Sequence, residues 1–184
     1  MSTSFPGFSS PMAGTDAPLD MLAACHTRIE KQCATLTRLV PHLAEHGADE
    51  QAATAARNVM RYFDTAALMH HADEEENLFP ELLDSMAGSD AVCLRELTQT
   101  LTADHRRLEA DWRHLRRALA EIAEERPAEL AAQDVAEFVE RYARHLQRED
   151  EELFPMAQRL LGDDALKRLG HAMSERRGPA APSA

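Results

Sequence analysis

Apolar residues recur at intervals of three and four along most of this chain, which is the spacing that places side chains on one face of an α-helix. The first such segment runs from Pro18 to Gly47. Proline is tolerated in the first turn of a helix, and glycine commonly follows the last turn, so both ends fit a helix. Its apolar positions are Leu19, Leu22, Cys25, Ile29, Cys33, Leu36, Leu39 and Leu43.

The same periodicity predicts three more long helices and one short helix. The long ones are expected at about residues 49–88, 90–122 and 127–162, and the short one at about residues 163–174. Pro80 lies inside the second segment and is expected to bend or locally break it. The chain contains no alternating pattern of the kind that β-strands show.

Four long helices with short connections predict an all-α fold, an up-down-up-down four-helix bundle with a short C-terminal fifth helix. We expect this domain to span residues 18–175. Residues 1–17 are rich in Ser, Pro and Gly and lack apolar periodicity, so they are predicted to form a disordered N-terminal arm. Residues 176–184 are expected to be a flexible tail.

Composition and charge narrow the class of protein. The formal net charge of −12 argues against nucleic acid or an anionic membrane as a partner. No apolar run approaches the roughly 20 residues that span a bilayer, and the N-terminus lacks the pattern of a secretory signal. The three cysteines form no CxxC pair, which argues against a disulfide framework or a structural zinc site. A cytoplasmic protein is expected.

One stretch of the second helical segment returns in the fourth. Residues 70–80 read HHADEEENLFP, and residues 145–155 read HLQREDEELFP. Both copies place a His and a Glu four positions apart, His70 with Glu74 and His145 with Glu149. Four residues turn a helix through about 400°, so each His and Glu share one helix face. Such a pair can hold a metal ion, and its repetition indicates two ions.

His26 and His105 are the corresponding histidines of the first and third helices. Each is followed four residues later by a glutamate and is flanked by apolar residues at helical spacing. From His26 to the end of its helix is about 20 residues, and from the start of the next helix to His70 is about 21, so at 1.5 Å per residue the two lie nearly level. Similar counts place His105 and His145 at that level.

A single His/Glu pair at this spacing is usually a solvated pair on a helix surface. Two copies with matched flanking residues, together with two further histidines at the same level, favour a buried metal centre. The predicted ligands are His26, His70, Glu74, His105, His145 and Glu149.

The remaining polar residues near the motifs are assigned other roles. His71 lies about 100° around the helix from His70 and is left out of the centre. Glu30 and Glu109 are expected to orient a ligand or to face solvent. A solvated acidic face is expected for Glu75, Glu76, Asp150, Glu151 and Glu152, and surface positions for His42, His46, His114 and His171.

Four imidazoles and two carboxylates without a thiolate suit two first-row metal ions. Glu74 and Glu149 can bridge the two ions while the histidines fill terminal positions. Iron is the preferred metal, and manganese and zinc fit the same ligand set less distinctively.

These residues resemble the hemerythrin-like (HHE cation-binding) family, whose pattern is H…HxxxE…H…HxxxE on four helices. The similarity covers about residues 19–162 and includes the Leu-Phe-Pro after each HxxxE motif. It implies that the six residues hold an oxo- or hydroxo-bridged di-iron centre with an open position for oxygen. Oxygen-carrying members have a second His four residues after the first on the third helix, where this chain has Glu109, and an Asp where it has Glu149.

Three functions are compatible with this pattern. The first, which we favour, is a protein that binds or senses a small ligand such as O₂ or NO. The second is a di-iron enzyme that acts as a peroxidase, a catalase-like protein or an oxidase, with peroxide as a ligand. The third is an iron-responsive module that contacts another protein.

Overall fold

The computed structural model describes residues 17–85 and 90–178, and every regular element in these ranges is a helix. The all-α prediction is therefore confirmed for the part of the chain that the structure describes. The predicted disordered arm lies outside these residues except for Ala17. None of the helices is both long enough and apolar enough to cross a membrane within the described ranges.

The first helix, α1 (Pro18–His46), has its proline in the first turn and ends at Gly47, whose φ of 71° lies in the left-handed region that favours glycine. A tight connection leads into α2 (Glu50–Arg61). Asp49 caps this helix, because its side chain accepts a hydrogen bond of 2.8 Å from the backbone N–H of Ala52.

The second predicted helix is a single rod that contains two π-helical turns. It consists of α2, η1 (Tyr62–Ala66), α3 (Ala67–Asp73), η2 (Glu74–Leu78) and α4 (Phe79–Asp84). Pro80 was expected to bend or break this helix, and instead the rod continues through it in the first turn of α4. The π turn immediately before it is wider than an α turn. This extra width relieves the clash between the proline ring and the carbonyl four residues earlier in the chain.

The remaining rods are α5 (Asp90–Ala123) and the composite of α6 (Ala132–Arg148), η3 (Glu149–Leu153) and α7 (Phe154–Leu160). The predicted start of the fourth helix at Pro127 is wrong, because α6 begins five residues later. Glu125 adopts a left-handed φ of 55° that turns the chain out of α5, and the connection then carries Leu130 into the core. The short last helix, α8 (Asp163–Arg177), ends three residues beyond its predicted end at Ser174. Arg176 and Arg177, expected to begin a flexible tail, therefore belong to this helix, and residues 179–184 lie outside the described residues.

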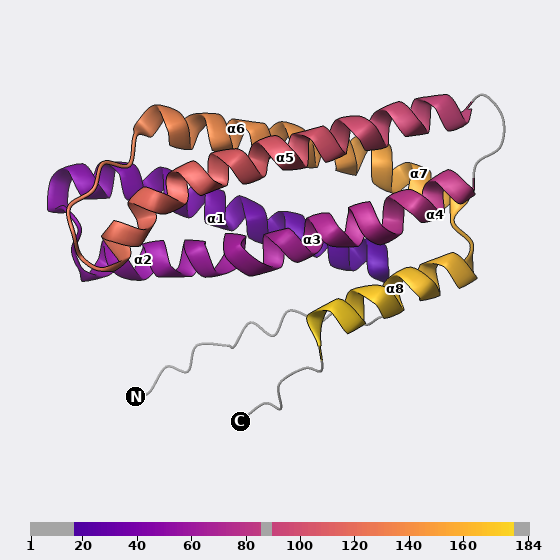
Figure 1. Ribbon diagram of the computed structural model, residues 1–184, viewed down its shortest axis with the longest axis horizontal. Helices are drawn as coiled ribbons and strands as arrows, with labels where there is room; N and C mark the ends of the chain where they lie inside the picture. The colour runs from indigo at the N-terminus through magenta and orange to yellow at the C-terminus, as the bar shows by residue number, and fades with distance from the viewer. Residues whose placement is uncertain (1–16, 86–89, 179–184) are drawn as a thin grey trace, which may run out of the picture.

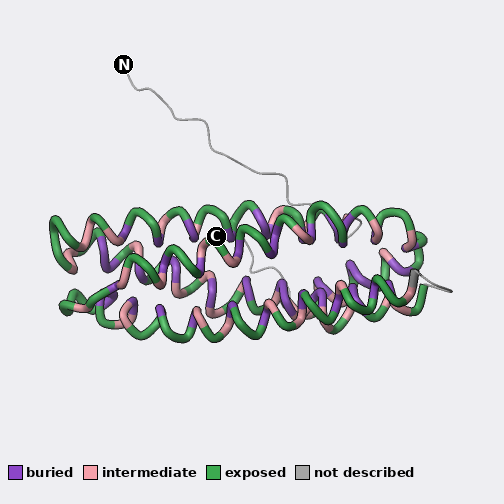
Figure 2. Tube along the Cα trace, turned by 90° about the horizontal axis from the view of Figure 1, so that it is seen from above, coloured by how far each residue is buried: buried purple, intermediate pink, exposed green. Residues whose placement is uncertain are grey.

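These rods pack side by side as a helical bundle (Figure 1). α1 contacts α2 and α6, and α5 contacts the same two helices from the other side. α8 lies outside this group, against α1 and α3. Buried positions face inward between the rods and exposed positions face outward, as the helical periodicity predicts (Figure 2).

The apolar core is divided into two clusters along the length of the bundle. One includes Ile29 and Leu108, and the other includes Leu22 and Leu101. Between these two clusters lies a layer of buried polar residues, which we call the polar layer. Its members are His26, His70, His71, Asp73, Glu74, His105, His145 and Glu149. All of them are at most 4 % exposed, so this layer is where the fold concentrates groups that are costly to bury.

Candidate metal centre

The two HxxxE motifs occupy equivalent positions in their rods. Glu74 is the first residue of η2 and Glu149 is the first residue of η3. In each turn the backbone N–H of a phenylalanine, Phe79 or Phe154, donates to the carbonyl of that glutamate five residues earlier. π turns of this kind occur often at functional sites. Both glutamates are completely buried, so the paired turns bring two carboxylates into the centre of the bundle.

The structure brings all six sequence-predicted residues together in two overlapping groups. In each group, one potential ligand atom from every residue lies within 4.8 Å of the others. Glu74 and Glu149 belong to both groups. The first group adds His26 and His70, and the second adds His105 and His145. Each group offers two histidines of its own and the two shared glutamates as potential metal ligands.

The imidazole nitrogens of this centre lie close to the carboxylate oxygens. Glu149 is 2.8 Å from His145 Nε2 and 3.0 Å from His26 Nε2. Glu74 is 3.3 Å from His105 Nε2 and 3.7 Å from His70 Nε2. Each glutamate thus approaches histidines from more than one rod, as a carboxylate that bridges two ions must.

Most of these close approaches do not have hydrogen-bond geometry. Both oxygens of Glu74 and of Glu149 are buried without a hydrogen-bond partner, and so are His26 Nε2 and both ring nitrogens of His70. Buried polar atoms are nearly always satisfied, and leaving one unpaired costs about 1–3 kcal/mol. Two nitrogens of the set do pair, since His105 Nε2 and His145 Nε2 share a hydrogen bond of 3.2 Å. Carboxylate oxygens that gather among imidazole nitrogens without bonding them fit the donors that a first-row metal ion requires.

Mutual contacts also shift the ionisation of these groups. Burial by itself lowers the pKa of an imidazole, but contacts with Glu149 and Glu74 outweigh it and raise the pKa of His105 to about 10. Contact with Glu149 similarly outweighs burial and raises the pKa of His26. Burial raises the pKa of Glu149, yet contacts with histidines, led by His145, bring it well below its usual value. A metal ion entering the centre must therefore displace protons from imidazoles.

Two residues assigned to a solvated acidic face instead contact ligand histidines. Glu75 Oε1 lies 2.7 Å from His105 Nδ1, and Asp150 Oδ1 lies 2.9 Å from His26 Nδ1. That assignment was wrong for Glu75, whose side chain is only 18 % exposed, and incomplete for Asp150, whose side chain is 53 % exposed. Each directly follows a motif glutamate. A carboxylate on the outer nitrogen of a histidine fixes the ring so that its other nitrogen faces the centre.

His71 is a member of the polar layer that the sequence analysis left out of the centre. It is 4 % exposed, and its ring stacks on that of His105 with centroids 4.0 Å apart. One nitrogen each from His71, His105 and His145 lie within 4.8 Å of one another. Burial, reinforced by the neighbouring His105 and His70, lowers the pKa of His71 well below its usual value.

Asp73 is a second residue whose role the sequence did not indicate. It is completely buried and forms ion pairs with Arg176 and Arg177 of α8. Arg176 also binds the side chain of Asn77 at 3.0 Å, on the next turn of the same rod. The partners are about 100 residues apart in the sequence, so no local pattern connects them.

The other candidates lie away from the centre. Glu30 is exposed, and Glu109 bonds Arg106 at 3.0 Å and belongs to none of the ligand groups. His46, His114 and His171 are exposed as predicted, while His42 is partly buried beside Asp49.

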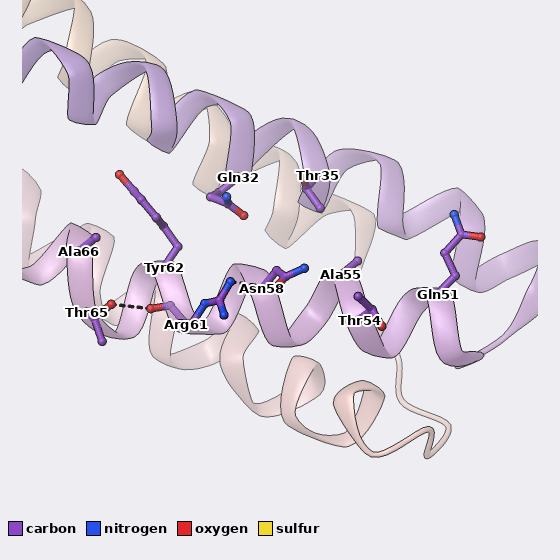
Figure 3. A pocket seen from close by; sticks show the side chains of 10 residues that line it. All are labelled: Gln32, Thr35, Gln51, Thr54, Ala55, Asn58, Arg61, Tyr62, Thr65 and Ala66. Atoms are coloured by element: carbon purple, nitrogen blue, oxygen red, sulfur yellow. Dashed lines mark hydrogen bonds between the residues drawn. The ribbon is translucent and has the colours of Figure 1, made fainter. Parts of the chain in front are cut away.

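A pocket lies elsewhere, between α1 and the α2–η1 segment (Figure 3). Its volume is about 670 Å³, and polar side chains including Gln32, Asn58 and Arg61 line it. None of its lining residues belongs to the polar layer, so this groove is separate from the candidate metal centre.

Two comparisons with known proteins indicate the family of this chain. The family model described as the hemerythrin HHE cation binding domain matches residues 17–157. An uncharacterized protein of Haemophilus influenzae is 32 % identical over 160 residues, which cover 87 % of this chain and 90 % of that protein.

Proposed function

The chain belongs to the hemerythrin HHE cation-binding domain family, and from this premise we propose that it is a di-iron protein that binds or senses O₂ or NO. The observation that carries the proposal is the pair of overlapping ligand groups that share Glu74 and Glu149. The proposed ligands of the two ions are His26, His70, Glu74, His105, His145 and Glu149.

In this proposal the residues of the chain hold the two metal ions and exclude water from them. The two glutamates offset the charge of the cations, and the histidines hold them from outside. Apolar clusters on both sides of the polar layer exclude water from it. Iron, when bound, supplies reversible redox chemistry and an open position for a small ligand. An oxo or hydroxo bridge between the ions is part of this proposal.

The proposal extends to the arrangement of the chain. We propose that the domain expected at residues 18–175 extends to Arg177, where α8 ends, and forms an up-down-up-down four-helix bundle with α8 as an additional helix. The contacts of α1 and α5 with the same two neighbours support this arrangement. A cytoplasmic location is proposed because the three cysteines form no CxxC pair. The proposed partner is a small ligand, and the net charge of −12 argues against nucleic acid and anionic membranes.

Iron loading and optical spectroscopy test the proposed function. The protein is loaded with Fe²⁺ under argon, its metal content is measured, and spectra are recorded under argon, air and peroxide. We expect two ions per chain and a charge-transfer band that appears in air and disappears on deoxygenation. His70→Ala and His145→Ala should each lose one or both ions, whereas His114→Ala, at an exposed position, should retain both.

Two other results would redirect or refute the proposal. Sustained turnover of peroxide without a reversible band would support the enzyme alternative. A content well below two ions, unchanged in the His70 and His145 variants, would refute the di-iron proposal itself.

The carboxylates behind the ligand histidines provide a separate prediction. Glu75→Gln removes the charge that holds the outer nitrogen of His105 and should weaken metal binding by about 10- to 100-fold. Asp150→Asn should act in the same direction on His26, with a smaller effect because Asp150 is half exposed. Glu152→Gln, on the same acidic stretch but without a ligand contact, is the matched control. Chelator competition measures all three, and equal affinities would argue against the outer carboxylates.

A further inference from the structure

His71 lies where it can complete one half of the centre. Its ring is stacked on His105 at 4.0 Å between centroids and lies at 80° to the ring of His145, 6.0 Å away. These are the two histidines of one ligand group. His70, the preceding residue, belongs to the other group with His26. Neighbours on a helix point about 100° apart, so one rod that faces two ions can direct His70 to one and His71 to the other.

Neither ring nitrogen of His71 has a hydrogen-bond partner, although the side chain is buried. The nearest carboxylate oxygen, on Glu109, is 4.0 Å from His71 Nδ1, beyond hydrogen-bond distance. A histidine that only fills space in a core normally bonds at least one nitrogen, because an unpaired polar atom is costly there. Two unpaired nitrogens on a ring beside His105 and His145 are lone-pair donors placed to coordinate the same cation as those two residues.

The second half of the centre has no equivalent of this residue. The position that follows His145, corresponding to His71 after His70, is Leu146, which is buried in the apolar cluster. The two copies of the motif therefore differ at this position. One half of the centre has three imidazoles within reach, and the other has two.

We propose that His71 is a metal ligand, the third imidazole of the ion held by His105 and His145. This proposal rests on the proposed function, since it assigns a ligand within that di-iron centre. It makes the two ion positions unequal, with five protein groups around one ion and four around the other when the shared glutamates are counted in both. The ion on the His71 side should be bound more tightly.

The test is the variant His71→Leu, which copies the residue that the repeat carries at the same position. Wild type and variant are titrated with Fe²⁺ alone under argon against a competing chelator. We expect the wild type to bind two ions. The variant should lose one ion or bind it at least about tenfold more weakly, because even residues that only hydrogen-bond a metal ligand change the affinity by that factor. His114→Leu controls for the loss of an exposed histidine, and circular dichroism of the metal-free proteins checks the fold.

Two outcomes separate this proposal from the one on which it rests. A wild type that binds two ions, with a folded His71→Leu variant of unchanged affinity, would overturn the role of His71 alone. A wild type that binds well below two ions would overturn the proposed function, and the assignment of His71 with it.

A measurement on the wild type covers the case of a variant that does not fold. With Co²⁺ as the probe and ¹⁵N-labelled histidine, ligated imidazoles show large paramagnetic shifts. Five of the nine histidines should be shifted in this way. A count of four, with the signal of His71 among the unligated rings, would contradict the proposal.

Discussion

Glu149→Gln is expected to remove metal from both halves of the centre at once. The carboxylate of Glu149 lies 2.8 Å from His145 Nε2 in one half and 3.0 Å from His26 Nε2 in the other. The amide has nearly the same shape but no charge, so each ion loses an anionic ligand while the packing of η3 is preserved. The metal content should fall from two ions to below one per chain. It is measured after gel filtration in a buffer that contains a weak chelator.

The matched control is Glu151→Gln, two residues further along the same π turn. Its side chain is exposed and belongs to no ligand group, so its metal content should equal that of the wild type. If Glu149→Gln instead lost only one ion, Glu149 would be a terminal ligand, and the bridging role assigned to it would be wrong.

Asp73→Ala is expected to cause the largest loss of stability. It leaves Arg176 and Arg177 facing a buried position without the carboxylate that pairs with both. Breaking a buried ion pair costs about 3–5 kcal/mol. Because the two arginines are partly exposed, the free energy of unfolding should fall by about 3 kcal/mol. Urea denaturation of the metal-free protein measures the free energy of unfolding, and hydrogen exchange should show α8 as the region most affected.

Glu81→Ala is the control, because it also removes an ion pair between the second rod and α8. Glu81 of α4 binds Arg168 of α8 through two hydrogen bonds of 2.7 Å, but Arg168 is 62 % exposed. Exposed pairs contribute about 0–1 kcal/mol, so this variant should remain close to the wild type. If Asp73→Ala and Glu81→Ala lowered the free energy of unfolding equally, the burial of Asp73 would not determine how strongly it binds α8.

The sequence alone was sufficient to predict that the residues of the internal repeat lie close together. Helical periodicity gave the helices, and counting residues along them placed His26 and His105 level with the two HxxxE motifs. The structure gathers these residues in one layer. Such reasoning works because the rise of a helix per residue is fixed, so distances along a rod can be read from the numbering.

Residues whose role depends on three-dimensional geometry were harder to predict. His71 was set aside because a rotation of 100° seemed too large for a single centre, yet its potential ligand atom groups with those of His105 and His145, while that of His70 groups with that of His26. Glu75 and Asp150 belong to an acidic stretch, and only the packing of neighbouring rods shows which carboxylates reach a histidine. The partners of Asp73 come from a distant part of the chain, which no periodicity reveals.

The polar layer also limits how the length of this chain can change during evolution. An inserted residue near the end of a rod only lengthens the bundle or a connection. The same insertion within the layer would rotate everything beyond it by about 100° and separate the histidines from their carboxylates. The matching π turns η2 and η3 each hold one more residue than an α turn, at the same place in both motifs. A lineage that gained or lost such a residue in one motif alone would have misaligned its halves, so the two turns are expected to be inherited together.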